Sequence, residues 1–348
     1  MPLSALTPPA VDATPIFEIF RGNHATELLT AAVAHFNLFT RLAERPMTAA
    51  ELGQALGLAP RPTVVLVTAL RAFGLLTIYA DKLRLTDLAR EHLLPGAPFD
   101  VGDYVGLAAA SPGVLAMVER LRTNRPADHD TGAPFLYREG VASAMEHEAS
   151  ARHFTLALAG RAKNVAPSLA QRVLVGDGPR LLVDVAGGTG IYSIAFLQRN
   201  PNLRAIVLDR PEVLKVANEF ANAYGVTDRF ETCSADMFRD PLPSDADIVL
   251  LSNVLHDWDV PECRALIARA ASALRPGGQL VIHDVFLNDA LDGPLPIALY
   301  SAALFCLTEG RLYSAAEYAA WLREAGLVPA AVVPTLIHCG ALAGRKPV

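Results

Sequence analysis

Apolar and polar residues repeat along the chain with two different periods. In the N-terminal part, apolar residues recur every three or four positions at 25–44, 48–57 and 61–73, which predicts amphipathic helices. A short alternating segment at 76–86 follows and predicts a β-hairpin that turns at Asp81–Lys82. We therefore expect this part of the chain to be mainly helical, with one small hairpin.

Helix, turn, helix and a two-stranded wing form the layout of a winged helix, a fold that often binds DNA. The helix that would enter the major groove, 61–76, carries Arg61 and Arg71 as its charged residues. A groove-reading helix must present polar side chains to base edges and cations to phosphates. This helix presents residues such as Val64 and Val65 instead, so we expect it to be buried in a core or a subunit interface.

From about residue 180 the pattern changes to apolar, strand-like runs separated by amphipathic helices. The strand-like runs are 181–187, 204–209, 247–254 and 279–286. Helices are predicted between them at 211–224 and 260–274, and this alternation favours a mostly parallel sheet covered on both faces. The segments 327–334 and 335–344 then predict a closing antiparallel hairpin. The expected fold is an α/β, Rossmann-like doubly wound sheet behind a helical N-terminal domain.

Composition and charge narrow the class of protein. The chain has 348 residues, of which 52% are hydrophobic and 19% charged, enough for two or more packed domains. A formal net charge of −6 argues against nucleic acid or an anionic membrane as a partner. The four cysteines are far apart, and no carboxylate–histidine cluster has the spacing of metal ligands. No run is apolar enough to span a bilayer, so we expect a soluble cytoplasmic protein without a bound metal.

The strand at 181–187 continues into a helix through a turn that contains Gly187, Gly188 and Gly190. Because glycines carry no side chains, such a turn lets a ligand approach the backbone closely. The pattern differs from G-x-G-x-x-G in having Asp184 within the strand. A carboxylate there repels a pyrophosphate and can meet a cation. A ligand with a positively charged amino acid head therefore fits better than a nicotinamide dinucleotide.

Two further acidic residues follow neighbouring strands. Asp209 ends the second strand, where a carboxylate can accept both ribose hydroxyls of a nucleoside. Asp236 comes after the next strand and can accept from an adenine amino group, while Met237 can pack against the ring. The alternative for each acid is a solvated loop carboxylate or a helix N-cap. Three acids at the carboxyl ends of strands together favour the ligand site.

This set of features resembles the S-adenosylmethionine-dependent methyltransferases of the Rossmann-like fold. The whole chain resembles the small-molecule O-methyltransferases of the caffeate/hydroxyindole type, which include many from bacterial natural-product pathways. The segments that carry the resemblance are 183-VDVAGGTG-190, 208-LDRPEV-213, 234-SADMF-238, 254-VLHDWDV-260 and 274-LRPGGQLVIHD-284. The resemblance implies S-adenosylmethionine as cofactor, a small aromatic substrate that is methylated on a hydroxyl, and a homodimer formed through the N-terminal domain.

The resemblance also implies three parts along the chain. Residues 1–100 would form a winged-helix-like dimerisation domain, and 101–165 a helical connecting region that contributes to the substrate pocket. Residues 166–348 would form the S-adenosylmethionine-binding domain. Phe154, in the connecting region, is expected to border the cofactor.

His256 comes directly after the strand 247–254, at the sheet edge where ligands bind. The resemblance implies that His256 is the general base that takes the proton of the substrate hydroxyl, and a histidine suits this role because its ordinary pKa is about 6.5. The orienting acid of the family aligns with Asp284. A second acid aligns with Leu312, and Glu309 lies nearby without matching the pattern. The alternative is that His256 is a strand-end residue bonded to the backbone.

Several residues near these motifs have two interpretations each. Trp258, with Asp257, contacts the cofactor or only marks the entry to the next helix. Tyr300 and Phe305 pack in the core, or they form a wall for a flat aromatic substrate. His283 is expected to face the side of the sheet opposite to Asp284, because neighbouring strand residues alternate.

Two rival functions stay open at this point. Because Leu312 occupies the position of the second acid, the first rival is an enzyme with the same fold and cofactor that catalyses a reaction other than methylation. The winged-helix layout leaves room for a ligand-responsive DNA-binding regulator, against which the sparsely charged helix 61–76 argues.

Overall fold

The computed structural model describes residues 2–125, 148–178 and 180–348, and the chain forms two compact units. Unit 1 comprises 1–17, 135–286 and 315–348, and unit 2 comprises 18–134 and 287–314. Residues 287–314 pack with the N-terminal helices rather than with the sheet, and the boundaries expected at residues 100 and 165 stay a prediction. Much of the expected connecting region, 126–147, lies outside the described residues.

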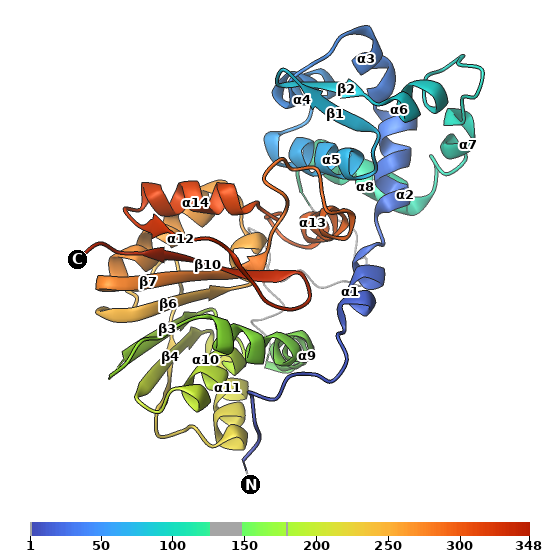
Figure 1. The fold of residues 1–348 in the computed structure, drawn as a ribbon. Coiled ribbons are helices and arrows are strands. Elements are labelled where there is room, and N and C mark those ends of the chain that lie inside the picture. The colour runs from blue at the N-terminus through green and yellow to red at the C-terminus, as the bar shows by residue number, and fades with distance from the viewer. Residues whose placement is uncertain (1, 126–147, 179) are drawn as a thin grey trace. The chain divides into compact units, whose positions relative to one another are not determined.

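Unit 1 is built on a sheet with the strand order β5-β4-β3-β6-β7-β10-β8, and β9 pairs with β10 (Figure 1). The strands are β3 (Arg180–Val185), β4 (Leu203–Asp209), β5 (Phe230–Ser234), β6 (Ala246–Ser252), β7 (Leu274–Val285), β8 (Val328–Pro329), β9 (Val333–Pro334) and β10 (Cys339–Arg345). Strands β3 to β7 pair in parallel, whereas β10 is antiparallel to β7, β8 and β9. The expected parallel sheet with an antiparallel closing element is confirmed.

Helices cover both faces of this sheet (Figure 1). They are α9 (Glu148–Arg172), α10 (Ile191–Arg199), α11 (Pro211–Tyr224), α12 (Val260–Ala273) and α14 (Ala315–Glu324). Helix α9 packs against α10 and α11, while α14 packs against α12 and β10. The strand order reverses between β3 and β6, and ligands of doubly wound sheets bind at the carboxyl ends of strands beside such a reversal.

Unit 2 is mainly helical and contains the expected wing. Its helices are α2 (Ala25–Thr30), η1 (Ala31–His35), α3 (Leu38–Glu44), α4 (Ala49–Leu56), α5 (Pro60–Ala72), α6 (Asp87–His92), α7 (Gly102–Gly106), α8 (Pro112–Thr123) and α13 (Leu295–Leu307). The wing pairs β1 (Leu76–Tyr79) with β2 (Lys82–Leu85), and Tyr79 lies opposite Lys82. The expected turn at Asp81–Lys82 is therefore wrong by one residue. Ala80 and Asp81 form the turn, both with positive φ, as a two-residue hairpin loop requires.

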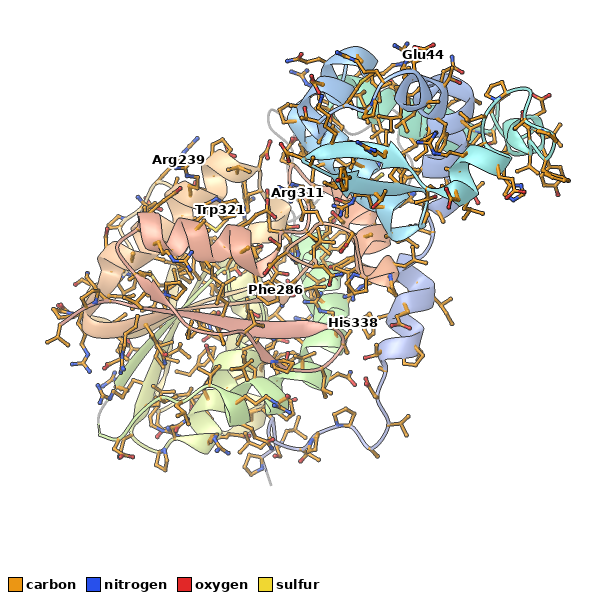
Figure 2. All side chains as sticks on the ribbon, turned by 45° about the horizontal axis from the view of Figure 1, so that its top comes forward. Glu44, Arg239, Phe286, Arg311, Trp321 and His338 are labelled. Carbon is orange, nitrogen blue, oxygen red and sulfur yellow. The ribbon has the colours of Figure 1, made fainter. Side chains whose placement is uncertain are left out.

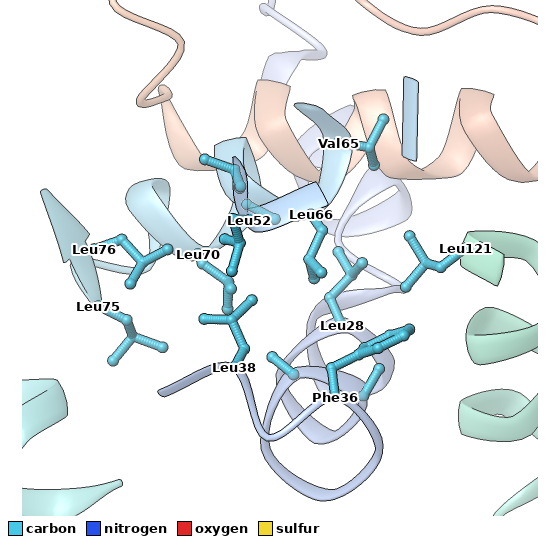
Figure 3. Packing of buried hydrophobic residues seen from close by; sticks show 14 of the residues in the cluster. Leu28, Phe36, Leu38, Leu52, Val65, Leu66, Leu70, Leu75, Leu76 and Leu121 are labelled. Atoms are coloured by element: carbon cyan, nitrogen blue, oxygen red, sulfur yellow. The ribbon is translucent and has the colours of Figure 1, made fainter. Parts of the chain in front are cut away.

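Helix α5 lies inside the apolar core of unit 2 (Figure 3). Its Val65 and Leu66 are at most 1% exposed, and α13 packs against it. Arg61 is itself buried, donating to Asn124 Oδ1 at 2.9 Å and to the carbonyl oxygen of Thr308 at 3.2 Å. The expectation that this helix is buried is confirmed, and its N-terminal cation binds carbonyl and amide oxygens of its own unit.

The described ranges, 2–125, 148–178 and 180–348, contain neither a helix that could span a membrane nor a cluster of metal-binding side chains. No helix in these ranges is both long and apolar enough to cross a membrane. No three or more His, Cys, Asp or Glu side chains in the same ranges are grouped to hold a metal ion. The four cysteines are free thiols.

Candidate functional site

The turn from β3 to α10 leaves no room for side chains at two of its glycines. A Cβ on Gly187 would lie 2.7 Å from Asp184 Cγ and 2.8 Å from Val207 Cγ1. A Cβ on Gly190 would lie 2.6 Å from Phe230 Cζ, and Gly190 has a φ of +67°. Glycine meets both demands, because it lacks a Cβ and adopts positive φ readily. The backbone of this turn therefore packs directly against the neighbouring strands at the carboxyl edge of the sheet.

We expect Gly190→Ala to lower the free energy of unfolding by about 2 to 4 kcal/mol, since the positive φ and the overlap with the Phe230 ring each cost energy. Urea denaturation measures the loss. Gly326→Ala is the matched control in the same unit, because Gly326 has a φ of +78° with nothing within 4 Å of its Cβ position. Equal losses in the two variants would show that the close approach to Phe230 contributes nothing.

Asp184 is fully buried in β3, directly before this turn. Its Oδ2 accepts a hydrogen bond from Ser193 Oγ at 2.7 Å, whereas its Oδ1 has no hydrogen-bond partner among the described residues. Burial raises the pKa of Asp184 to about 7, against the lowering effect of the Ser193 hydroxyl. A buried carboxyl oxygen without a donor is costly, and an ammonium group of a ligand would satisfy it.

Asp209 ends β4 and joins the glycine turn to this strand. Its Oδ2 accepts from the backbone N–H of Gly188 at 2.9 Å, and its Oδ1 accepts from that of Arg210 at 2.8 Å. Burial raises the pKa of Asp209, and these two backbone bonds oppose the increase. Each carboxylate oxygen keeps a further lone pair, which suits the hydroxyls of a ribose.

Asp236, after β5, is exposed and caps a turn. Its Oδ1 accepts from the backbone N–H of Phe238 at 2.8 Å and of Arg239 at 3.3 Å. No helix begins here, so the exposed Asp236 matches the loop-carboxylate alternative, and contact with an adenine stays a prediction. The half-buried Met237 is held by its carbonyl oxygen, which accepts from Arg269 Nε at 2.9 Å.

The two aromatic residues predicted to border the cofactor lie on different elements. Trp258 is 8% exposed and packs edge-on against Phe238, with 4.5 Å between the ring centroids. It comes directly before Asp259, the N-cap of α12, and thus marks the entry to that helix. Phe154 is half-buried on α9 and packs edge-on against the exposed His153. Contact of either ring with a cofactor stays a prediction.

His256 and Asp284 form a buried pair at the carboxyl edge of the sheet. His256 lies in η3 (Leu255–Asp257), which begins shortly after β6, and Asp284 lies near the end of β7. His256 Nδ1 is 2.6 Å from Asp284 Oδ1, which also accepts from the backbone N–H of Val285 at 2.8 Å. A carboxylate at Nδ1 places the ring proton there, so Nε2 is the nitrogen that can accept a proton from a ligand.

Neighbouring charges adjust the proton affinity of this pair. Burial disfavours the charged imidazolium, but Asp284 and Asp257 outweigh burial and raise the pKa of His256. Burial would raise the pKa of Asp284, whereas its contact with His256 holds it below the ordinary value. Asp257 Oδ1 lies 3.7 Å from His256 Nε2 and has no hydrogen-bond partner in the described ranges. Burial raises the pKa of Asp257 to about 6.

We expect Asp257→Asn to lower the pKa of His256, because one of the negative charges that stabilise the imidazolium is removed. A base works when it is neutral, so the acidic limb of the kcat/KM profile should move to lower pH. Glu262→Gln, an exposed acid on α12, is the charge-matched control. An acidic limb that stays in place, or moves to higher pH, would contradict this coupling.

Three residues that we did not predict contribute to the same edge of the sheet. Tyr318, on α14, donates its hydroxyl hydrogen to Asp284 Oδ2 at 3.3 Å. Arg161, on α9, lowers the pKa of His283 and of Asp284 by its positive charge. Tyr192, on α10, packs edge-on against the His283 ring. No local motif indicates these contacts, because each comes from a helix far along the chain.

His283 faces the other side of the sheet from Asp284, as expected. Its Nδ1 lies 2.8 Å from Ser252 Oγ, and its Nε2 lies 3.1 Å from Thr335 Oγ1. Burial lowers the pKa of His283 to about 3, so the ring is neutral at physiological pH. His283 is therefore a structural histidine, distinct from His256.

The two predicted substrate-wall residues belong to α13 of unit 2. Phe305 is 1% exposed within the apolar core of this unit, as the core-packing alternative predicts. Tyr300 is half-buried, and the guanidinium carbon of Arg21 lies 3.8 Å from the centroid of its ring. A substrate contact of Tyr300 stays a prediction.

The position of the expected second acid holds the buried, apolar Leu312. Its backbone N–H donates to Ser301 Oγ at 3.1 Å within unit 2. Glu309 Oε2 lies 3.7 Å from Arg61 Nη2 in the same unit. Glu309 is therefore paired with Arg61.

Comparisons with known proteins identify the family to which the chain is similar. Residues 125–328 match a family model described as an O-methyltransferase domain. The 3-hydroxy-5-methyl-1-naphthoate 3-O-methyltransferase of Streptomyces sahachiroi is 37% identical over 329 residues, covering 93% of this chain and 92% of that protein. The tetracenomycin polyketide synthesis 8-O-methyl transferase TcmO of Streptomyces glaucescens is 30% identical, covering 95% and 96%. An O-methyltransferase family 2 protein from Planctomyces limnophilus, crystallised with apigenin, is 49% identical with a TM-score of 0.89, covering 99% of each chain.

Proposed function

Because the chain belongs to the family of S-adenosylmethionine-dependent O-methyltransferases, we propose that it methylates a hydroxyl group of an aromatic small molecule. The observation that supports this most is the buried His256–Asp284 pair beside the glycine turn, at the carboxyl edge of the sheet. The relatives support the substrate class, since one acts on a hydroxynaphthoate and another was crystallised with apigenin.

The acidic residues beside the glycine turn suit S-adenosylmethionine, which supplies an activated methyl group on its sulfonium. Asp184 Oδ1, buried and without a donor in the described part of the chain, suits the ammonium group. Asp209, which accepts from the Gly188 N–H, suits the ribose hydroxyls. The predicted neighbours of the adenine and the rest of the cofactor are Asp236, Met237, Phe154 and Trp258.

His256 and Asp284 suit the removal of the proton from the substrate hydroxyl. A phenol has a pKa of about 10, so only about one molecule in a thousand is ionised at pH 7. His256 Nε2 would take the hydroxyl proton, while bound S-adenosylmethionine would supply the methyl group to the hydroxyl oxygen and leave as S-adenosylhomocysteine once its S–CH3 bond is broken. Asp284 holds Nδ1–H and stabilises the imidazolium, which then returns its proton to solvent.

The test is to incubate the protein with S-adenosylmethionine and a set of aromatic compounds, and to measure S-adenosylhomocysteine. Apigenin and 3-hydroxy-1-naphthoate are the probes, and 1-naphthoate, which lacks the hydroxyl, is the matched control. We expect product with the two hydroxyl compounds and none with the control. Tight cofactor binding without product from any phenolic compound would favour chemistry other than methylation, the alternative that Leu312 leaves open.

We also propose that the protein is cytoplasmic and that it forms a homodimer through its N-terminal region. Helix α1 (Thr14–Arg21) exposes Ile16, Ile19 and Phe20, which are 70%, 82% and 77% accessible. Apolar side chains gathered on one helix in this way favour an interface with a second copy. The free thiols suit a reducing compartment. Light scattering coupled to gel filtration gives the oligomeric state.

A further inference from the structure

We propose that Tyr318 is a positioning residue, whose hydroxyl fixes the Asp284 carboxylate and thereby sets how readily His256 accepts a proton. This inference rests on the proposed function, in which His256 is the base. Every residue involved belongs to unit 1: His256 follows β6, Asp284 lies on β7, and Tyr318 lies on α14.

The two oxygens of Asp284 have separate donors. Oδ1 accepts from His256 Nδ1 at 2.6 Å and from the backbone N–H of Val285 at 2.8 Å. Oδ2 accepts from the Tyr318 hydroxyl at 3.3 Å, the one donor to this oxygen among the described residues. Asp284 and Tyr318 are 0% exposed and His256 is 4% exposed, so bulk water does not reach Oδ2 to replace that donor.

Two aromatic neighbours pack against the Tyr318 ring. Phe286, directly after β7, packs edge-on at 5.7 Å between ring centroids and 88° between ring planes. Trp321, one turn further along α14, packs edge-on at 5.4 Å and 85°. Figure 2 labels both residues. A fully buried ring with these contacts has little rotational freedom, so its hydroxyl stays directed at Asp284.

Other charged groups near His256 do not replace this contact. Asp257 adds negative charge beside Nε2, and Arg161 adds positive charge from α9. His283 is neutral and bonds to Ser252 and Thr335 on the other side of the sheet. If the Tyr318 hydroxyl is removed, the two donors to Oδ1 keep Asp284 in place, while Oδ2 loses its donor. The less-compensated carboxylate then attracts the imidazolium more strongly, and His256 stays protonated to higher pH.

The test is Tyr318→Phe, which removes the hydroxyl and keeps the ring. The readout is the pKa of His256, measured without substrate by NMR on protein with 15N-labelled histidine and assigned with His256→Ala. We expect the pKa of His256 to rise by about half a unit to one unit. Tyr224→Phe, which changes a buried tyrosine of α11 in the same unit, should leave it unchanged.

Activity with apigenin gives a second readout. We expect kcat of Tyr318→Phe at pH 7 to fall by about 2- to 10-fold with KM nearly unchanged, the range that a pKa rise of this size allows. The ratio to wild type should return toward one as the pH rises, because the deficit is one of protonation. A loss of packing would lower activity equally at every pH and would leave the pKa of His256 where it was.

A third variant covers the case in which Tyr318→Phe does not fold. Site-specific 3-fluorotyrosine at position 318 has a more acidic hydroxyl, donates more strongly, and should lower the pKa of His256. An unchanged pKa of His256 in the variants that fold would overturn the role of Tyr318. Failure of wild type to methylate any phenol would overturn the proposed function instead, and the substrate-free NMR result would still decide on Tyr318.

Discussion

Replacing His256 by alanine is expected to lower kcat at pH 7 by about 10²- to 10⁴-fold, the range typical of a lost general base. The reason is that Nε2 is the one imidazole nitrogen left to accept a proton, since Nδ1 is bonded to Asp284. The affinity for S-adenosylmethionine should stay close to that of wild type, because the residues proposed to bind this cofactor lie at the glycine turn and do not include His256. Single-turnover rates and calorimetric titration measure the two quantities.

His92→Ala serves as the control for this prediction, since His92 is a half-buried histidine of unit 2. It should keep the wild-type kcat. Full turnover in His256→Ala would remove His256 from the reaction. A loss of cofactor affinity as large as the loss of kcat would show instead that the histidine supports the cofactor site.

Replacing Asp209 by alanine is expected to weaken binding of S-adenosylmethionine by about 10- to 10³-fold, since hydrogen bonds to a charged group are worth about 1.5 to 3 kcal/mol each. The variant also loses the bond from the Gly188 N–H, which ties the glycine turn to β4. Calorimetry gives the Kd, and kcat at saturating cofactor should stay near that of wild type.

Asp228→Ala provides the comparison for Asp209, because the Asp228 side chain is 73% exposed in the same unit. Its Kd should equal that of wild type. An unchanged Kd in Asp209→Ala would mean that the ribose is held elsewhere, and the carboxylate would then serve only to shape the turn.

The sheet and most of its ligand edge could be predicted because they depend on local patterns. Apolar runs separated by helices specify parallel strands, and residues that follow the carboxyl ends of such strands meet at one edge. His256 follows β6, and Asp284 lies near the end of the neighbouring strand β7. Their contact could therefore be expected from the order of the strands in the sheet. The alternation of side chains along β7 likewise predicted that His283 and Asp284 face opposite sides.

The features that could not be predicted depend on contacts between distant segments. Tyr318 reaches Asp284 from a helix 34 residues further along the chain, and no spacing rule connects the two. Residues 287–314 join the N-terminal unit because α13 packs against α5, more than 200 positions earlier in the chain. The wing turn lies one residue earlier than predicted. A two-residue loop needs positive φ at both positions, and an alanine such as Ala80 does not indicate positive φ in the sequence.

The most direct test of the central claim is the pH dependence of the kcat/KM ratio between wild type and His256→Ala, with apigenin or 3-hydroxy-1-naphthoate as substrate. A general base matters only while the hydroxyl is protonated, so its benefit should shrink as the pH approaches the phenol pKa of about 10. We predict a large ratio near pH 7 that falls steadily toward one at high pH. A ratio that stays constant across this range would contradict the assignment of His256 as the base.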